Sequence, residues 1–481
     1  MALTFHDSGF LERGYTLNYF VTKKLDENQY LVTTDHGAWV VLSKTEHDLL
    51  RLERVEEDPN LFSVLKQKGI ILTEDNVNDA VKAYAERYHF LFRAPTLHIV
   101  TPTMRCNSSC IYCHSMVKDE NAKGFDMNEE TAKSIVDFIL KTPSRDLVIE
   151  FQGGDCLLNY PVTEYMIDYG QEKAKKTGKN LKFRLVTNLT LMNDDILKSL
   201  SKRKIMGIST SLDGPRTVHD KNRRYLSGKG TYDDVVHWIK RMKTEWEHNF
   251  NLRALTTITR HTLGYGRELV DEYIKLGFDG IFLRSLNNIG FAKQTWNEIG
   301  YTAEEYLSFW ESTLDYIISV NSRKPFFEQL SVIFLKKMLQ KWDPMYVDIQ
   351  SPCGAAIGQL LYNHNGDIHT CDEGKLFPEL RLGNVMTTSY KDIFRSKVVK
   401  SMIDVSSRQG YLCDNCVWNP FCGICPIYTH SSQGTIVSKL AMDDHCKINN
   451  HVLETLFRKI INSERDRKVF LSWFSNKDIM K

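Results

Sequence analysis

Residues 106–113 read Cys106-Asn-Ser-Ser-Cys110-Ile-Tyr-Cys113, and they come shortly after the strand-like run Leu97–Thr101. Three thiolates this close together can bind three corners of a cubic four-iron cluster and leave the fourth iron without a protein ligand. Such an open iron can bind a substrate or cofactor, whereas a cluster with four cysteines mainly transfers electrons. Zinc is the competing interpretation, because His114 or a distant residue would complete a tetrahedral site. The spacing favours the iron–sulfur interpretation.

Strands and helices alternate around this stretch, from Pro95 to about Leu286. Helical stretches such as Glu129–Lys141 and Asp233–Trp246 fill the gaps between short strand-like runs. This repetition predicts a parallel sheet with helices outside it, either a partial barrel or a doubly wound sheet. We take α/β, with a partial (β/α)6 TIM-like barrel, as the expected fold class, with its chemistry at the carboxyl ends of the strands. The expected strands are Leu97–Thr101, Leu147–Phe151, Phe183–Thr187, Gly207–Ser211, Leu252–Thr257 and Gly280–Leu283.

The composition is that of an ordinary globular protein of 481 residues, 42% of them hydrophobic and 25% charged. A formal net charge of +2 argues against a nucleic-acid partner. No stretch approaches the roughly 18 apolar residues of a membrane span, and the N-terminus lacks the pattern of a signal peptide. We therefore expect a cytoplasmic protein with no membrane partner, whose 11 cysteines stay reduced and serve mainly as metal ligands.

Residues 1–90 predict a small α+β module. Its strand-like runs are followed by a helix that begins at Ser43 or Thr45 and by a second helix near Asn60–Lys68, which ends at Gly69. Strands followed by a small helical pair fit a winged-helix-like module for peptide recognition. A simple packing extension is the alternative.

Seven further cysteines lie between residues 353 and 446. Four of them form the run Cys413-x2-Cys416-x5-Cys422-x2-Cys425. A zinc ribbon normally has a longer loop between its two cysteine pairs, so this spacing fits a ribbon poorly. Seven ligands also exceed the needs of one zinc ion but suit two iron–sulfur clusters. The other three are Cys353, Cys371 and Cys446.

The chain is therefore expected to contain five units. The barrel and the cysteine-rich segment are separated by a mostly helical stretch, and a helical tail follows the last cysteine. The expected bounds are 1–90 for the winged-helix-like module, 91–290 for the partial barrel, 291–345 for the helical connector, 346–450 for the cysteine-rich iron–sulfur domain and 451–481 for the tail.

The C-x3-C-x2-C spacing, with an aromatic residue before the last cysteine, resembles the radical S-adenosylmethionine superfamily. Gly153-Gly154-Asp155 follows the second strand, where that family has a glycine pair and an acid. The resemblance implies that this loop binds the amino group of the cofactor's methionine, since glycines allow close backbone approach and a carboxylate pairs with an ammonium. The family usually has Glu and Pro where this chain has Asp155 and Cys156, and Cys156 is either an inert buried thiol or a reactive one. The implied cofactor contacts are Tyr112, Gly153, Gly154, Asp155, Asn188, Ser211, Asp213 and Arg223.

By the same resemblance, Cys106, Cys110 and Cys113 hold a catalytic [4Fe-4S] cluster. Its open iron binds S-adenosyl-L-methionine, and reductive cleavage gives a 5′-deoxyadenosyl radical that abstracts hydrogen from a substrate carbon. This chemistry implies a low-potential electron donor such as flavodoxin or ferredoxin.

The C-terminal cysteines resemble those of the SPASM domain, which binds auxiliary four-iron clusters. The spacing Gly366-x4-Cys371 matches the glycine-to-cysteine element of that domain. The resemblance implies an inner cluster with three cysteine ligands, whose fourth position is either open or filled by a residue such as His364 or His369. It assigns Cys353, Cys371 and Cys425 to the inner cluster, and Cys413, Cys416, Cys422 and Cys446 to the outer one.

SPASM enzymes mostly modify peptides or proteins, and the whole chain resembles the B-type radical maturase of His-Xaa-Ser peptide systems. Phe90–His98 and Ile208–Gly214 carry part of that match. The expected substrate is a ribosomally made precursor peptide, which would receive a crosslink or an oxidised residue. A sulfatase-maturase-like, formylglycine-forming enzyme is one alternative, and a non-catalytic metal-binding peptide adaptor is another. The possible proton acceptors are Asp213, Asp372 and His445.

Overall fold

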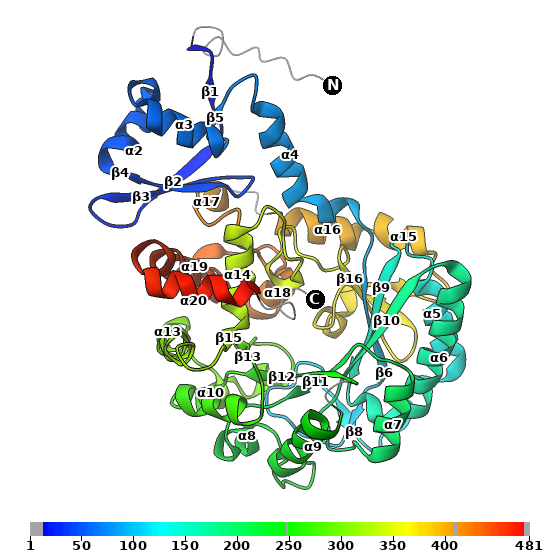
Figure 1. Ribbon diagram of the computed structural model, residues 1–481. Coiled ribbons are helices and arrows are strands. Elements are labelled where there is room, and N and C mark those ends of the chain that lie inside the picture. Colours follow the sequence, from blue (N-terminus) through cyan, green and yellow to red (C-terminus); the bar gives the residue numbers. More distant parts are fainter. Residues whose placement is uncertain (1–12, 247–248, 408–410, 476–481) are drawn as a thin grey trace.

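The computed structural model describes residues 13–246, 249–407 and 411–475 (Figure 1). The ends of the predicted module and tail, residues 1–12 and 476–481, lie outside the described residues. Helices surround a twisted central sheet, and a smaller N-terminal module projects from one side of it (Figure 1). Among the helices that the structure describes, none is both long and apolar enough to cross a membrane.

A nine-stranded mixed sheet forms the centre, in the order β14-β12-β11-β10-β9-β6-β16-β17-β18. Neighbours from β14 to β16 are parallel, and the last two pairings are antiparallel. This confirms the α/β class and the expected parallel strands. In order along the chain, the first six strands of this sheet are β6 (Leu97–Thr103), β9 (Asp146–Gly153), β10 (Asn180–Val186), β11 (Gly207–Ser211), β12 (Asn251–Thr257) and β14 (Leu283–Arg284).

Amphipathic helices cover the outer face of this sheet. In α5 (Glu129–Ile139), Ala132, Ile135, Val136 and Ile139 share one buried face, as a period of 3.6 residues requires. The Asn128 side chain accepts from the Thr131 N–H and starts that helix. The other covering helices are α6 (Tyr160–Thr177), α7 (Asp194–Lys202), α8 (Arg216–Asn222), α9 (Tyr232–Glu245) and α10 (Gly266–Lys275).

The structure corrects two expectations about this sheet. The run Gly280–Leu283 is split, because β13 (Gly280–Ile281) pairs with β15 (Phe327–Glu328) and only β14 joins β12. The cysteine-rich segment, in which no strand was expected, also adds strands to this sheet. Its first strand, β16 (Gln359–Tyr362), pairs with β6, and two further strands continue the sheet: β17 (Asp367–His369) and β18 (Arg381–Asn384).

The N-terminal module has its own small core of Val32, Leu42, Leu50, Leu61 and Leu65 with their neighbours. Its first helix begins after Ser43, as predicted, in a capping box with Glu46. Three antiparallel strands form one sheet, and a two-stranded pair lies beside it. The elements are β1 (Thr16–Leu17), β2 (Phe20–Lys24), β3 (Gln29–Thr34), β4 (Trp39–Ser43), α2 (Lys44–Arg51), α3 (Pro59–Gln67), β5 (Ile71–Leu72) and α4 (Val77–Arg87).

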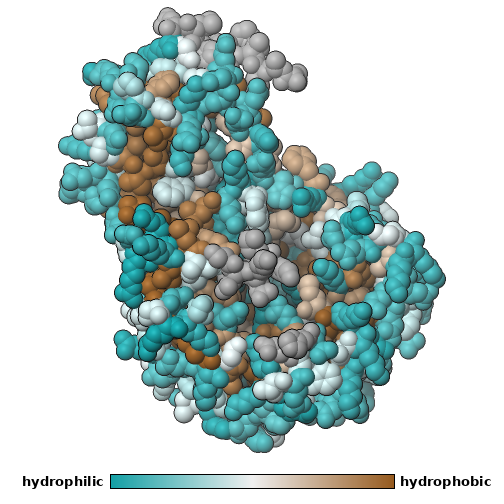
Figure 2. Space-filling view, in the orientation of Figure 1, coloured by the Kyte–Doolittle hydropathy of each residue, from teal (hydrophilic) through white to brown (hydrophobic). Residues whose placement is uncertain are grey.

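Helices predominate in the rest of the chain that the structure describes. Helices α14 and α19 lie between the barrel and the N-terminal module (Figure 1), and apolar surface runs along the module toward this junction (Figure 2). The remaining elements are β7 (Arg105–Cys106), β8 (Lys118–Asp119), α11 (Phe291–Gln294), α12 (Trp296–Ile299), α13 (Ala303–Val320), α14 (Gln329–Leu339), α15 (Tyr390–Arg395), α16 (Lys397–Ser406), α17 (Tyr411–Asp414), α18 (Pro426–Gln433), α19 (Asp444–Asn462) and α20 (Glu464–Ser475).

Candidate active site

The first three cysteines lie in a loop at the carboxyl end of the parallel sheet. Backbone bonds hold this loop in place: Ser109 N–H donates to Arg224 O at 2.8 Å and Phe291 N–H donates to Cys113 O at 3.0 Å. Burial raises the pKa of the Cys110 thiol to about 11, and nearby Cys113 adds to that shift while Arg223 opposes it. Burial also raises the pKa of the Cys106 thiol well above its ordinary range, and the charges of Cys110 and Cys113 add to that shift. The loop therefore brings the three predicted ligands together.

The Gly153-Gly154-Asp155 loop packs directly beneath the cysteine loop. A Cβ atom on Gly154 would lie 1.9 Å from Arg105 O, so only glycine fits this approach. The Asp155 carboxylate is buried and accepts from Asn188 N–H at 2.8 Å, Thr187 Oγ1 at 2.9 Å and Leu157 N–H at 3.0 Å. This carboxylate therefore connects the end of β9 to the end of β10. A cofactor ammonium group that binds here would be a further donor to a carboxylate that already accepts three hydrogen bonds.

Asn188 reaches from the end of β10 into the cysteine loop. Its Nδ2 donates to Asn107 Oδ1 at 3.0 Å and to Ser108 Oγ at 3.1 Å, and it lies 3.8 Å from Cys106 Sγ. Hydrogen bonds to cluster sulfurs are one means by which proteins tune iron–sulfur potentials. The structure thus places this residue at the cysteines themselves. Ser211 ends β11 at the same edge of the sheet.

A buried polar network follows on the neighbouring strand. Tyr112 OH donates to Asp213 Oδ2 at 2.8 Å, and Arg223 Nη1 donates to Tyr112 OH at 2.7 Å. Burial raises the pKa of Asp213, against the opposing effect of the Arg223 charge. Three of the predicted cofactor contacts therefore contact one another, which fixes their positions before any ligand binds.

Cys353, Cys371 and Cys425 form a second group. They pack in one small apolar cluster with Ile289 and Met402. Burial raises the pKa of the Cys425 and Cys371 thiols well above the ordinary range, and Cys353 adds to both shifts. Backbone N–H groups point at two of the sulfurs, Gly374 at Cys371 (3.2 Å) and Tyr428 at Cys425 (3.4 Å). These are the three predicted ligands of the inner cluster.

Cys413, Cys416, Cys422 and Cys446 form the third group. Burial raises the pKa of Cys446 to about 12, and the other three thiols all add to that shift. Asn450 Nδ2 donates to Cys446 Sγ at 3.4 Å and Asn449 Nδ2 to Cys422 Sγ at 3.6 Å. Within the described ranges no three potential ligands converge as they would on one metal ion. Cysteines that do not converge on one point are compatible with a four-iron cluster, because the cysteines of such a cluster bind separate irons at the corners of a cube.

Three charged side chains, Arg284, Asp348 and Glu373, lie close to the second cysteine group, and the sequence analysis missed them. We call them the charged cluster. Arg284 is half-buried, with 39% of its side chain accessible. Its Nη2 lies 3.0 Å from Asp348 Oδ2 and 3.5 Å from Glu373 Oε1. Burial raises the pKa of Glu373 to about 7, while the Arg284 charge opposes that shift. The place of Arg284 at the end of the sixth strand is the signal that could have identified it.

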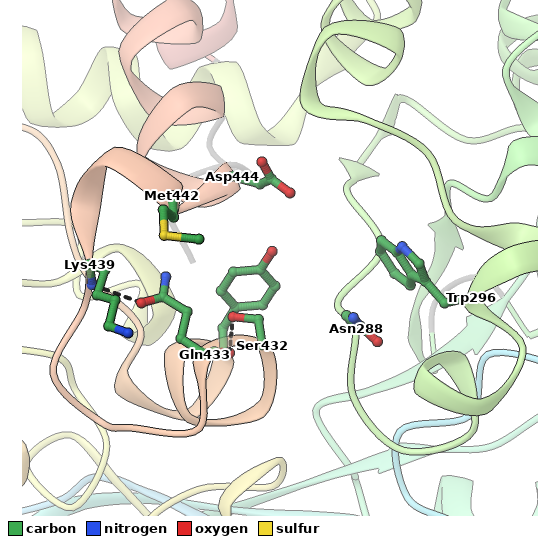
Figure 3. Close-up of a pocket in the computed structure, with 8 residues that line it drawn as sticks. Asn288, Trp296, Ser432, Gln433, Lys439, Met442 and Asp444 are labelled. Atoms are coloured by element: carbon green, nitrogen blue, oxygen red, sulfur yellow. Dashed lines mark hydrogen bonds between the residues drawn. The ribbon is translucent and has the colours of Figure 1, made fainter.

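An open pocket of about 430 Å³ lies near the charged cluster (Figure 3). Asn287 joins the two regions, because it donates to Glu373 Oε1 at 2.9 Å and its Oδ1 lies 3.0 Å from His445 Nε2. His445 in turn stacks on Tyr428, with ring centroids 3.7 Å apart. Amides, opposite charges and aromatic rings line the pocket: Asn288, Trp296, Tyr428, Ser432, Gln433, Lys439, Met442 and Asp444.

The other predicted residues divide between this charged cluster and the rest of the fold. Asp372 and His445 lie near the charged cluster, next to predicted iron–sulfur ligands. His364 instead packs against Phe125, and His369 is buried on β17 with no bond to its Nδ1 in the described chain. Cys156 is fully buried, and burial raises its pKa well above the ordinary range, which favours the inert role.

Known proteins resemble this chain over both cysteine-rich regions. The Radical SAM superfamily profile matches residues 100–263, and the profile of the SPASM iron–sulfur cluster-binding domain matches residues 353–417. A cysteine-type anaerobic sulfatase-maturating enzyme of Clostridium perfringens is 25% identical over 370 residues, which is 74% of this chain and 95% of that protein.

Two solved structures share the fold at low identity. Native anSMEcpe with bound AdoMet covers 76% of this chain and 98% of its own, with 20% identity and a TM-score of 0.64. Streptococcus suis SuiB bound to precursor peptide SuiA covers 90% of this chain and 100% of its own, with 16% identity and a TM-score of 0.54. The chain is therefore an enzyme that contains a radical SAM domain and a SPASM iron–sulfur cluster-binding domain, and its cofactors are S-adenosylmethionine and iron–sulfur clusters.

Proposed function

We propose that this enzyme is a peptide maturase, which abstracts hydrogen from a side-chain or α carbon of a ribosomally made precursor peptide to give a crosslink or an oxidised residue. The cluster and S-adenosylmethionine, when bound, supply the radical that begins this reaction. The chain's own residues position the peptide and exclude water. A low-potential donor such as flavodoxin or ferredoxin provides the electrons.

The proposal includes the ligand assignments. In each of the three cysteine groups, the thiols lie close enough together for the charge of one to raise the pKa of another. Thiolates are also the soft donors that iron–sulfur clusters require. Cys106, Cys110 and Cys113 hold the radical cluster. The other two groups hold the inner and outer auxiliary clusters.

The observation that carries the peptide proposal is the pocket of about 430 Å³ near the charged cluster. Arg284, Asp348 and Glu373 supply both charges beside it. Peptide backbones present alternating donors and acceptors, which pocket side chains such as Asn288, Gln433 and Ser432 can bind. A pocket with this lining suits a bound peptide.

Fold coverage supports the same substrate class. The fold of SuiB, which was crystallised with a precursor peptide, extends over 90% of this chain, against 76% for anSMEcpe. Residues 13–90 provide a three-stranded sheet with β2 and β4 at its edges, and such edges bind peptides as an added strand. We propose that this winged-helix-like module binds the leader of the precursor peptide.

Deleting residues 1–90 would not test the leader proposal cleanly. Arg87 donates to Pro420 O, and Thr33 Oγ1 donates to Val417 O, so the module supports the loop between Cys416 and Cys422. A deletion would therefore disturb the outer cysteine group together with any peptide site. The test is better made on the substrate, with the full-length enzyme.

The experiment uses anaerobically purified enzyme, reconstituted with iron and sulfide and reduced in the presence of S-adenosylmethionine. The readouts are 5′-deoxyadenosine and the peptide mass, with a candidate precursor peptide and the same peptide without its leader. We expect a mass loss from hydrogen abstraction in the complete precursor and much slower modification of the leaderless peptide.

Two outcomes identify the alternatives. Formylglycine in a sulfatase-derived peptide, made equally well without any leader, would establish the sulfatase-maturase reading that the Clostridium relative favours. A fully iron-loaded enzyme that forms no 5′-deoxyadenosine with any peptide would leave the adaptor reading and contradict the proposal.

A further inference from the structure

Two short loops meet where the barrel faces the SPASM domain. One follows Cys113 and the other follows Cys371. His114 Nε2 lies 3.6 Å from Asp372 Oδ2, and Lys375 Nζ donates to Ser115 Oγ at 3.1 Å. Two polar contacts therefore join the neighbours of a radical-cluster cysteine to the neighbours of an inner-cluster cysteine.

Lys375 is the basic residue of this junction, and its surroundings hold it firmly. The preceding residue, Gly374, donates its N–H to Cys371 Sγ, and a Cβ atom there would lie 2.5 Å from Thr370 Oγ1 and 3.3 Å from that sulfur. Lys375 therefore extends from the turn whose backbone contacts the Cys371 sulfur. Its acceptor, Ser115, is only two residues from Cys113 and is a neutral hydroxyl, so this contact does not cancel the charge.

The electrostatics of the site agree with this geometry. Burial lowers the pKa of Lys375, and the charges of Asp372, Cys113 and Cys371 oppose that effect. A thiol from each of the two cysteine groups therefore interacts with this one ammonium group. Charges interact more strongly at such a half-buried position than in water.

We propose that Lys375 is a shared cation that raises the reduction potentials of both the radical cluster and the inner auxiliary cluster. An iron–sulfur cluster gains one negative charge on reduction, and a fixed positive charge beside it stabilises the reduced form. Because one side chain serves two centres, the two potentials are coupled and change together. The inference takes the ligand assignments given above, and it does not depend on the identity of the substrate.

The test is a potentiometric titration of the full-length, iron-loaded protein, followed by electron paramagnetic resonance. The radical cluster is recognised by the change in its spectrum when S-adenosylmethionine binds. The auxiliary clusters are titrated alone in a background with Cys106, Cys110 and Cys113 replaced by Ala. In Lys375→Met, we expect the ratio of reduced to oxidised cluster at a fixed potential to fall about tenfold for both centres, which is a shift of about −59 mV for a one-electron couple.

Lys293→Met is the matched control. Lys293 Nζ also links the barrel side to the SPASM side, through Ser431 O at 2.7 Å, but Lys293 is an exposed residue. This variant therefore removes the same charge and the same kind of link at a position where water and salt screen the charge. It should leave both potentials unchanged, and Lys375→Arg should keep them near those of the native protein. A Lys375→Met shift that is confined to one cluster, or that Lys293→Met reproduces, would overturn the shared-cation proposal.

Ser115→Ala keeps the proposal testable if Lys375→Met fails to retain its iron. This variant keeps the lysine but removes the hydroxyl that holds Nζ near Cys113. We expect a negative shift that is larger for the radical cluster than for the inner one. An unchanged radical-cluster potential in iron-replete Ser115→Ala would contradict the proposal.

Discussion

The loops 106–113 and 413–422 both carry closely spaced cysteines, but they are supported in different ways. The first loop lies on the barrel's own strand ends, where Asn188, Asp155 and Gly154 hold it through polar contacts and close backbone packing. The second loop is covered by the N-terminal module. Tyr19 OH donates to Asp414 O at 2.6 Å, and the Arg87 guanidinium lies over the Phe421 ring. The first loop is thus held largely by residues of the barrel strand ends, whereas the second loop is contacted by residues more than 300 positions away in sequence.

The largest expected effect comes from removing the ligands of the first loop. Replacing Cys106, Cys110 and Cys113 with Ala should abolish 5′-deoxyadenosine formation while the protein keeps the iron of its auxiliary clusters, because those sites lie on other loops. Product analysis and iron determination on the same sample check this. Loss of all iron would show that the first loop and the SPASM domain fold as one unit.

Arg87→Ala should have the next largest effect, and on the opposite region. Arg87 is 2% exposed and donates to Pro420 O and to Lys337 O, so its removal leaves two buried carbonyl groups without this partner. Each such group costs about 1–3 kcal/mol. Thermal unfolding should shift to lower temperature, and iron should be lost first from the outer site.

Lys82→Ala is the control for that variant, since Lys82 is an exposed residue of the same helix, α4. It should change neither stability nor iron content. An Arg87→Ala protein with full iron and unaltered unfolding would contradict the dependence of the outer loop on the module.

Asn188→Ala should have a moderate effect confined to the first loop. The variant loses the amide that binds Asn107 and Ser108 and approaches Cys106. We expect about a tenfold slower formation of 5′-deoxyadenosine, equivalent to about 1.4 kcal/mol, with the outer cluster unaffected. Rate measurements at saturating S-adenosylmethionine, with spectra of the auxiliary clusters, would reveal an effect that instead spreads to both regions.

Thr33→Val should have the smallest effect. It removes one hydrogen bond to Val417 O, of 2.9 Å, and keeps the shape of the side chain. The loss should be about 1 kcal/mol in the free energy of unfolding, with the iron content retained. Denaturant titration measures it, and iron loss as large as that of Arg87→Ala would show that the module contact is cooperative rather than a sum of separate bonds.

The same contrast separates what sequence could predict from what it could not. The parallel strands and the capped helix after Ser43 follow from local periodicity and capping chemistry, which short stretches such as Leu147–Phe151 express fully. The three cysteine groups follow from spacing and family resemblance. These features need only the residues near them in sequence.

The missed features all depend on contacts between distant segments. Gln359–Tyr362 is a short apolar run within a cysteine-rich stretch, and nothing local indicates that it pairs with β6 more than 250 residues earlier. Asp348 and Glu373 come from different loops and meet at Arg284 only after the sheet is complete. The contact between Arg87 and the outer cysteine loop is of the same kind.

The pairing of β16 with β6 has a consequence for protein engineering. A chimaera that exchanged the cysteine-rich segment from residue 346 onward would remove the strand next to β6 and expose a hydrogen-bonding edge in the middle of the barrel sheet. Open edges of this kind promote association between chains. A graft of foreign auxiliary-cluster sequence should therefore retain Gln359–Tyr362 of the host, because this strand belongs to the barrel sheet of the recipient.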